Sequence, residues 1–272
     1  MTKKALGSLA LWFAFAVAPA LAQMASGPSP SATAGIIPRS HGPMLLRSVV
    51  PGGVTSLNWS GYAVAGANFT YANGSWHVPL VECTTTPNAY SVFWVGIDGF
   101  TNNTVEQVGT GSDCNGTTPV YYAWYEFYPA NLVVITSLQV SPGDKMGATV
   151  SYEGGKFTLD MTDYTTGKSF KVTKSVPGAL RTSAEWIAEA PSSGGAVLPL
   201  ADFGRANYGA DYNSSDPDSC NATDSSVTDG EIVDFGSKVA EITMVSSKNV
   251  VEAVPTALTS DGSSFRINWK SE

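Results

Sequence analysis

Three stretches of the sequence place carboxylic acids among aromatic residues in a pattern that could support acid–base chemistry. They are VFWVGID (Val92–Asp98), YAWYEFY (Tyr122–Tyr128) and SAEWIAE (Ser183–Glu189). Successive side chains of an extended chain point to opposite faces, so the third stretch puts Glu185 and Glu189 on one face and Trp186 on the other. A positioned carboxylate can take a proton from water and return it to a leaving group. These acids are therefore candidate general acids and bases.

The same alternation assigns faces in the other two stretches. The positions on the face away from the core are Val92, Trp94, Gly96 and Asp98 in the first stretch and Tyr122, Trp124, Glu126 and Tyr128 in the second. An antiparallel sheet often turns one face to solvent, which is the simplest interpretation. Tryptophans fit such a face poorly, because large exposed apolar surface usually marks a binding site. We therefore expect a concave sheet face lined with aromatic residues.

Several standard catalytic sets are absent. The sequence has no D-T-G or D-S-G, no G-x-S-x-G and no H-E-x-x-H. Histidine occurs twice: His41 lies in an N-terminal stretch of unusual composition, and His77 lies in a stretch that we interpret as a loop. A His-dependent triad would depend on His77 alone, and no zinc-ligand pattern is present. We expect neither a metal nor another cofactor.

The elements that must position these residues are short strands. Runs rich in β-branched and aromatic residues alternate with Gly, Pro, Asn and Asp, and turn signals such as SPGD (Ser141–Asp144) separate them. No run sustains a helical period. We predict one all-β domain over residues 56–272, an antiparallel sandwich of roughly a dozen strands.

The N-terminal region has the composition of a leader. Residues 1–22 combine Lys3 and Lys4, an apolar run and a small-x-small end, which predicts a secretory signal peptide. The run is shorter than the roughly 20 apolar residues of a membrane span. Residues 23–55 contain no acidic residue, and their only formal charges are Arg39 and Arg47, which favours a linker or prosegment. We expect an exported, unanchored protein.

The domain that follows is strongly acidic. All 23 acidic residues lie at Glu82 or beyond, against 11 Lys and Arg from Ser56 onward. Such a charge repels nucleic acid and anionic membranes, so we expect neither as a partner, and it is compatible with an acidic habitat. Three cysteines in an exported chain indicate one disulfide and one remaining thiol. We expect Cys83 and Cys114 to pair and Cys220 to be left over, although the sequence does not fix the pairing.

Four motifs follow one another along the chain: VFWVGIDG (Val92–Gly99), EQVG (Glu106–Gly109), YAWYEFYP (Tyr122–Pro129) and SAEWIAE (Ser183–Glu189). In order and spacing they resemble the glutamic peptidases, or eqolisins. NWSGY near Asn58 and PLADFG from Pro199 are similar too. The resemblance covers residues from about Leu57 to Tyr208 and becomes weaker beyond them. Four motifs in register are specific where one alone would be weak.

The resemblance implies a fold and a site. It implies two curved antiparallel sheets of the concanavalin A-like or jelly-roll type, with a concave substrate groove. Carried over by motif, Gln107 and Glu185 form a catalytic dyad on that concave face. The residues matching groove-lining positions are Trp94, Asp98, Trp124 and Glu126, and Trp59 matches one at the groove edge. For Asp98 and Glu126, support of the dyad and contact with substrate remain open; we interpret Glu189 as solvated.

The two residue types of the dyad suit peptide hydrolysis in acid. Glu185 would take a proton from water, and the amide of Gln107 would stabilise the oxyanion. A histidine base would be protonated in acid, whereas a glutamate, with a reference pKa of about 4.3, stays partly ionised. Glu106 departs from the family, which more often has an apolar residue there. By alternation it would point into the core, at a cost in free energy, unless a bulge or the start of the strand turns it out.

The sequence therefore predicts a secreted, monomeric acid endopeptidase that acts on polypeptides. A glycoside hydrolase on the same kind of sandwich is one alternative, and it would draw its acids from Asp98, Glu126 or Glu185. A carbohydrate-binding module that stacks sugars on Trp94 and Trp124 is another. For residues 23–55 we weigh two hypotheses: a spacer, or a basic segment that covers an acidic groove near neutral pH and loosens on acidification.

Overall fold

The structure is a computed structural model that describes residues 39–212 and 219–272. The predicted signal peptide and the first part of the 23–55 stretch lie outside the described residues. The described chain is almost entirely β-structure, with one 3-10 helix, η1 (Ile232–Lys238). None of the described helical residues forms a helix long and apolar enough to span a membrane. The predicted all-β class is confirmed.

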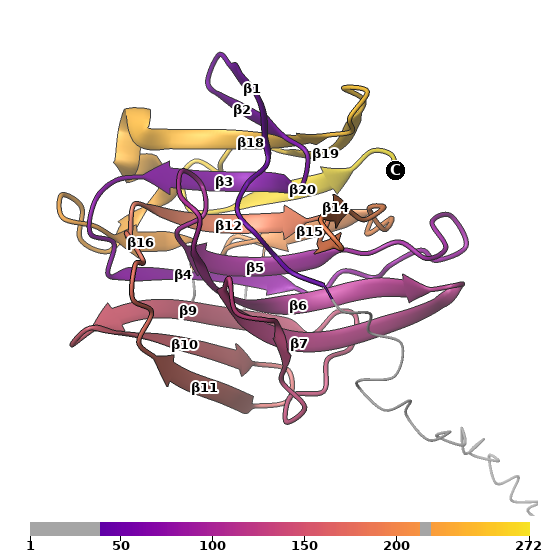
Figure 1. The fold of residues 1–272 in the computed structure, drawn as a ribbon, viewed down its shortest axis with the longest axis horizontal. Coiled ribbons are helices and arrows are strands. Elements are labelled where there is room, and N and C mark those ends of the chain that lie inside the picture. Colours follow the sequence, from indigo (N-terminus) through magenta and orange to yellow (C-terminus); the bar gives the residue numbers. More distant parts are fainter. Residues whose placement is uncertain (1–38, 213–218) are drawn as a thin grey trace, which may run out of the picture. The chain divides into compact units, whose positions relative to one another are not determined.

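One layer of the fold carries the strands of three motifs. In hydrogen-bonded order its strands are β1 (Leu46–Val50), β2 (Gly53–Ser56), β18 (Val239–Val245), β3 (Trp59–Ala65), β12 (Ser183–Glu189), β5 (Val92–Ile97), β6 (Val105–Asn115), β7 (Thr118–Tyr128) and β8 (Val133–Val134). All neighbours are antiparallel except β2 and β18, which run parallel. Figure 1 shows β3, β12, β5, β6 and β7 side by side.

The second layer packs against the first. Its strands are β11 (Lys168–Lys174), β10 (Lys156–Asp163), β9 (Lys145–Glu153), β4 (Tyr71–His77), β15 (Arg205–Tyr208), β20 (Phe265–Trp269) and β19 (Val251–Pro255). Two short strands, β16 (Asn221–Thr223) and β17 (Gly230–Glu231), extend β4, and β13 (Ser192–Ser193) pairs with β14 (Ala196–Val197). Because β19 also pairs with β18, hydrogen bonds join the two layers at one edge. The described residues thus form more strands than the dozen predicted.

The two faces of the first layer are packed differently. Its inner face meets the second layer in a core that includes Phe93, Val95 and Trp186. Its outer face carries a separate buried cluster built around Trp94 and Trp124, with Trp59, Tyr122 and Ile187 among its other members. The faces expected from alternation in β5, β7 and β12 are therefore confirmed.

Two segments differ from the strands that their composition favours. GEIVDF (Gly230–Phe235) forms only two strand residues before η1, because Ile232 and Phe235 are both buried, and a three-residue spacing puts two side chains on one face of a helix but on opposite faces of a strand. Of NLVVITSLQV, only Val133 and Val134 form a strand. His77, interpreted as a loop residue, is the last residue of β4 in the second layer.

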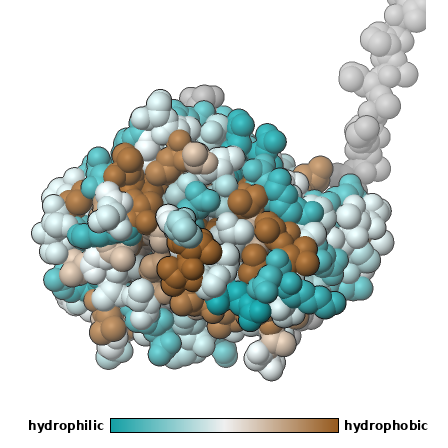
Figure 2. All heavy atoms as spheres, turned by 90° about the horizontal axis from the view of Figure 1, so that it is seen from above, coloured by the Kyte–Doolittle hydropathy of each residue, from teal (hydrophilic) through white to brown (hydrophobic). Residues whose placement is uncertain are grey.

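The described part of the predicted linker or prosegment is structured. Residues 39–45 run across the outer face of the first layer and lead into β1. Among the strands that the structure describes, β1 pairs with β2 alone, and all five of its residues are exposed, including Leu46 and Val49. Apolar patches lie among polar side chains on the side of the molecule from which β1 and β2 project (Figure 2). The absence of acidic residues from this stretch therefore does not prevent it from being structured.

Candidate active site

A row of directly opposed residues crosses the first layer. Glu185 of β12 lies opposite Gly96 of β5, Gly96 opposite Gln107 of β6, and Gln107 opposite Glu126 of β7. Directly opposed residues in neighbouring strands project to the same face of a sheet. Glu185, Gln107 and Glu126 therefore all point to the outer face, among the aromatic cluster. The structure brings the two residues of the expected dyad to one face.

Gly96 separates the two dyad residues without a side chain of its own. Glu185 and Gln107 stand two strand spacings apart, which is roughly 9–10 Å between their backbones. A Cβ at Gly96 would lie 2.8 Å from the Trp94 ring, so the indole leans over this position. The absence of a side chain at Gly96 therefore lets the Trp94 indole lie over the position between the carboxyl and the amide.

Burial disfavours the charged form of Glu185 in this arrangement. Its side chain is fully buried, and burial raises its pKa well above the usual range. The Ser183 hydroxyl opposes this shift, whereas the charge of Asp98 adds to it, as the charge of an ionised Glu106 would. A general base must be ionised, so Glu185 would need water or a new hydrogen-bond donor near it before it could act.

The segment 39–45 lies directly over the row. Gln107 Nε2 donates to the carbonyl oxygen of His41, and the His41 backbone N–H donates to Glu126 Oε2 at 2.9 Å. The imidazole lies 3.9 Å from the Trp124 ring, measured between centroids. Further along, the Met44 N–H donates to the Gly99 carbonyl at 3.0 Å. The segment thus covers the row on the outer face, and the indigo segment before β1 crosses the layer in Figure 1.

The three tryptophans that we expected to line the groove are not exposed to solvent. Trp59, Trp94 and Trp124 are all fully buried. Trp59 and Trp94 meet edge to face at 4.9 Å, and the Trp94 indole N–H donates to Glu189 Oε2 at 2.9 Å. They pack together on the outer face, beneath the N-terminal segment.

Asp98 and Glu126 make different contacts. Asp98 accepts hydrogen bonds at 2.8 Å from the backbone N–H groups of Arg181 and Thr182, and its Oδ1 also accepts from the Asn102 amide. These contacts hold together the loops at the end of the row, which is a supporting role. Glu126 contacts the chain that occupies the groove, and burial raises its pKa to about 8.

The interpretation of Glu189 as a solvated residue is wrong. The side chain is fully buried, and burial raises its pKa well above the usual range. It stands opposite Trp59 of β3 and Val92 of β5, so aromatic walls enclose it. Its hydrogen bond to Trp94 makes it a support for the indole that leans over Gly96.

Glu106 points into the core, as alternation indicates. β6 begins at Val105 and pairs regularly through Glu106, which lies opposite Ile97 and Phe127, so neither a bulge nor a late strand start turns it out. Its two carboxyl oxygens have no hydrogen-bond partner among the described residues. Burial, with the charge of Asp98, raises its pKa to about 9, so the side chain is buried as a neutral acid. Gln107 accordingly keeps the outer face.

Sequence reasoning did not find the contacts of Arg39. The Arg39 guanidinium pairs with Asp113 of β6 and donates to the Tyr122 hydroxyl at 2.8 Å. It also lies 4.7 Å from the centre of the Tyr90 ring. The signal in the sequence was indirect: basic residues in an acid-free segment, ahead of an acidic domain.

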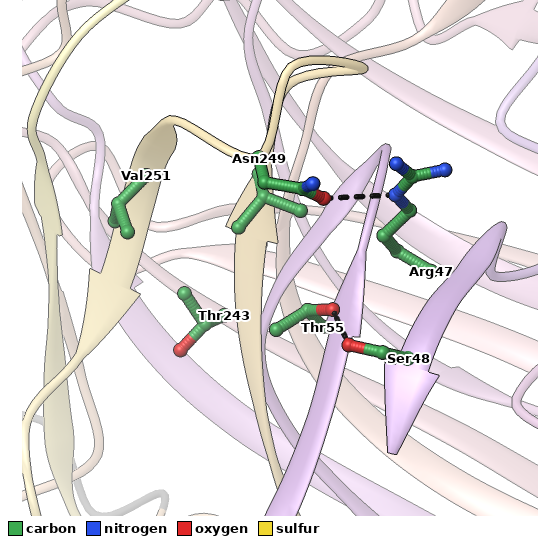
Figure 3. A pocket seen from close by; sticks show the side chains of 7 residues that line it. Arg47, Ser48, Thr55, Thr243, Asn249 and Val251 are labelled. Atoms are coloured by element: carbon green, nitrogen blue, oxygen red, sulfur yellow. Dashed lines mark hydrogen bonds between the residues drawn. The ribbon is translucent and has the colours of Figure 1, made fainter. Parts of the chain in front are cut away.

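An open depression lies elsewhere on the surface (Figure 3). Residues of β1, β2, β18 and β19 line it, and Arg47 Nε donates to Asn249 Oδ1 there at 2.9 Å. Its lining, which includes Ser48, Thr55 and Thr243, contains no carboxyl group. It offers no acid–base pair.

The predicted disulfide is present between Cys83 and Cys114, and Cys220 is buried outside it.

The chain matches known proteins over most of its length. Residues 57–253 match the Peptidase A4 family. Aspergillopepsin-2 of Aspergillus niger is 32% identical over 178 residues, which are 56% of this chain and 62% of that protein, so the chain spans less than two thirds of that relative. Scytalidopepsin B of Scytalidium lignicola is 33% identical over 186 residues, 63% of this chain and 68% of that protein.

Solved structures share the fold. Scytalido-glutamic peptidase bound to a transition state analog inhibitor aligns with a TM-score of 0.63 and 21% identity, covering 78% of this chain and 98% of that chain. Aspergilloglutamic peptidase from Aspergillus niger aligns with a TM-score of 0.56 and 26% identity, covering 67% of this chain and 99% of that chain.

Proposed function

The chain belongs to the peptidase A4 family, and we propose that it is a secreted acid endopeptidase that hydrolyses polypeptides with Gln107 and Glu185. Its relatives include aspergillopepsin-2 and scytalidopepsin B, and the Glu185–Gly96–Gln107 row supplies the residue types that the reaction needs. One observation carries the proposal. Gln107 donates its amide N–H to a peptide carbonyl, that of His41, in the groove.

In the proposed mechanism, ionised Glu185 takes a proton from a water molecule while the oxygen of that water attacks the peptide carbonyl carbon. The carbonyl π electrons move to the oxygen, and the amide N–H of Gln107 stabilises the resulting oxyanion. The oxyanion collapses, the C–N bond breaks, and protonated Glu185 gives its proton to the departing amine. The products are a carboxylic acid and an amine, and Glu185 returns to its ionised form.

The partners of the dyad have supporting roles. Trp94, held by Glu189, forms the wall beside the water, and Trp59 packs against Trp94. Glu126 accepts a hydrogen bond from a backbone N–H of the bound chain. This contact fixes the distance between the carbonyl of the bound chain and Gln107. Asp98 holds the loops at the end of the row.

We also propose that the residues before the β1–β2 turn act as a prosegment, after a signal peptide in residues 1–22. Residues 39–45 occupy the groove through His41, and β1 is an exposed edge strand whose one strand partner among the described residues is β2. Their departure would admit water to Glu185, weaken the burial that raises its pKa and let it ionise. The mature enzyme would be a monomer without metal or cofactor, and neither nucleic acid nor membrane would be its partner.

The test is digestion of a denatured protein at about pH 3, somewhat below the reference pKa of glutamate. A protease recognition sequence inserted in the exposed Pro51–Gly52 turn would let the segment be cut and removed, with its release checked by gel filtration. We expect digestion by the opened protein and none by Gln107→Ala or Glu185→Gln. The control is Glu153→Gln, at an exposed strand end. Full activity of Gln107→Ala would contradict the proposal.

A further inference from the structure

The strand that carries Glu185 is entered through a strained junction. β12 begins at Ser183, and the two residues before it are Arg181 and Thr182. Arg181 has a left-handed backbone, with a φ of 55°. Asparagine and aspartate tolerate this conformation, but for a residue with a long side chain it is uncommon and costs free energy. Such strain persists only where the surrounding structure imposes it, and it gathers at functional sites.

Backbone hydrogen bonds fix the junction on both sides. The N–H groups of Arg181 and Thr182 donate to the Asp98 carboxylate at 2.8 Å each. In the loop between β3 and β4, the Phe69 N–H donates to the carbonyl oxygen of Arg181 at 3.0 Å. The Gly66 N–H of the same loop donates to the next carbonyl oxygen, that of Thr182, at 2.9 Å. All four backbone polar groups of the two residues are thus paired immediately before β12.

The Arg181 side chain ties the junction to the second layer. Its guanidinium donates to the Phe69 carbonyl oxygen at 3.2 Å and to Asn68 Oδ1 at 3.3 Å. Its Cζ atom lies 4.1 Å from the centre of the Tyr152 ring of β9. A planar guanidinium can stack on a ring and donate hydrogen bonds in its own plane at the same time, which a lysine ammonium cannot do. The side chain thus clamps its own backbone against the β3–β4 loop and β9.

Three left-handed residues meet at this junction. Arg181 is hydrogen-bonded to Asp98 (φ 74°) and to Asn68 (φ 59°), and these are three of the six non-glycine residues with a positive φ in the part of the chain that the structure describes. The Asp98 N–H also donates to the Ser183 carbonyl oxygen at 3.0 Å, which ties the end of β5 to the first residue of β12. Half of the residues of this kind are therefore gathered where the strand of Glu185 begins.

We propose that Arg181 is a positioning residue, which holds the start of β12 so that the Glu185 carboxyl stays aligned with Gln107 across Gly96. The inference rests on the proposed peptidase function and adds to it a residue that acts through the backbone of β12. Glu185 is the third residue of β12, so the entry of the strand sets where its carboxyl lies. A misplacement on the order of 1 Å can lower the rate of a reaction roughly 100-fold.

The test compares three substitutions of Arg181 in the opened protein. The kcat and KM are measured on one fluorogenic peptide at about pH 3, well below the melting temperature of each variant. Arg181→Ala leaves the strained backbone without its clamp, so kcat should fall on the order of 10-fold. Arg181→Lys keeps the charge but not the planar fork, so its kcat should fall by a similar factor.

Arg181→Gly also removes the side chain, but it should behave differently. Glycine adopts the left-handed conformation freely, so the Asp98 carboxylate still holds the backbone, and kcat should stay within about 3-fold of the parent. The groove is untouched in all three variants, so KM should change less than about 2-fold. If Arg181→Ala does not fold, the comparison of Arg181→Lys with Arg181→Gly decides.

The matched control is Arg266→Ala in β20, a strand that pairs with β15 and β19. Arg266 stacks on the Tyr212 ring at the same distance, 4.1 Å, so the control removes a comparable contact and should leave kcat and KM unchanged. Unchanged kcat in Arg181→Ala, an Arg181→Gly variant as slow as Arg181→Lys, a loss seen only in KM, or an equal loss in Arg266→Ala would overturn the role of Arg181. Absence of turnover by the opened parent would instead remove the proposed function, and this role with it.

Discussion

Replacement of the buried Glu106 by glutamine should change how the stability of the protein depends on pH. Glu106 lies on the core face of β6 with no hydrogen-bond partner among the described residues, and its pKa is raised from 4.5 to about 9. A raised pKa in the folded state means that the full stability is present below the unfolded value and is lost as the pH rises through the folded value. The window of loss therefore runs from about pH 4.5 to about pH 9.

The size of the effect follows from the proton balance. Each pH unit inside the window lowers the free energy of unfolding by about 1.4 kcal/mol per group, so Glu106 alone takes away about 3 kcal/mol between pH 4.5 and pH 7. Glutamine has nearly the same shape and does not titrate. Burial of the glutamine amide lowers the free energy of unfolding of the variant by the same amount at both pH values. This cost therefore drops out of the difference between the two pH values, which is the quantity compared between the variant and the parent. Between about pH 4.5 and about pH 7, the free energy of unfolding of Glu106→Gln should therefore fall by about 3 kcal/mol less than that of the parent protein.

Urea unfolding at about pH 4.5 and about pH 7 gives these free energies. A Gln107→Ala background prevents the proposed self-digestion, and Glu153→Gln serves as the exposed control. The control should follow the pH dependence of the parent. The parent itself should lose stability as the pH rises, because the pKa of Glu126 is also raised, to about 8. If Glu106→Gln and the parent have parallel pH profiles, Glu106 is not held neutral in the core and the reasoning fails.

Three further predictions follow from single contacts. Gly96→Ala would bring a methyl group to 2.8 Å from the Trp94 ring, so kcat/KM should fall roughly 10- to 100-fold with little change in melting temperature; unchanged kinetics would contradict this. Burial lowers the pKa of His41 well below its usual value, so acidification below about pH 6.5 should favour release of segment 39–45 by up to about 1.4 kcal/mol per pH unit. Hydrogen exchange of this segment should show that dependence in the parent and a flatter one in His41→Gln. Removal of the Cys83–Cys114 bridge, which spans 31 residues, should cost about 3–4 kcal/mol in urea unfolding, and no loss would refute the loop-closure argument.

Alternation along single strands predicted much of the site. β5, β7 and β12 are regular, so Trp94, Trp124 and Glu185 lie on the face that their positions in the sequence indicate. The same rule predicted that Glu106 points inward. Alternation along a strand could not predict which residues cover the outer face of the first layer. Burial of Glu189 depends on walls from β3 and β5 that no local pattern encodes.

The contacts of the N-terminal segment could not be predicted from the sequence. Its charges suggested contact with an acidic groove, yet the contacts found involve backbone atoms as much as charge: the carbonyl of His41 on Gln107 and its N–H on Glu126. Backbone groups are the same in every residue, so sequence carries no sign of them. The pairing of Arg39 with Asp113 joins residues 74 apart in the sequence, which a local pattern cannot indicate.

The most direct measurement of joint action by Gln107 and Glu185 is a double-mutant cycle on kcat/KM. The opened protein, Gln107→Ala, Glu185→Gln and the double variant would be compared on one fluorogenic peptide at about pH 3, below the reference pKa of glutamate. Residues that act on the same water and the same carbonyl are strongly non-additive. We expect the double variant to be no slower than the slower single variant. Losses that multiply, with each residue contributing independently, would contradict a shared catalytic centre.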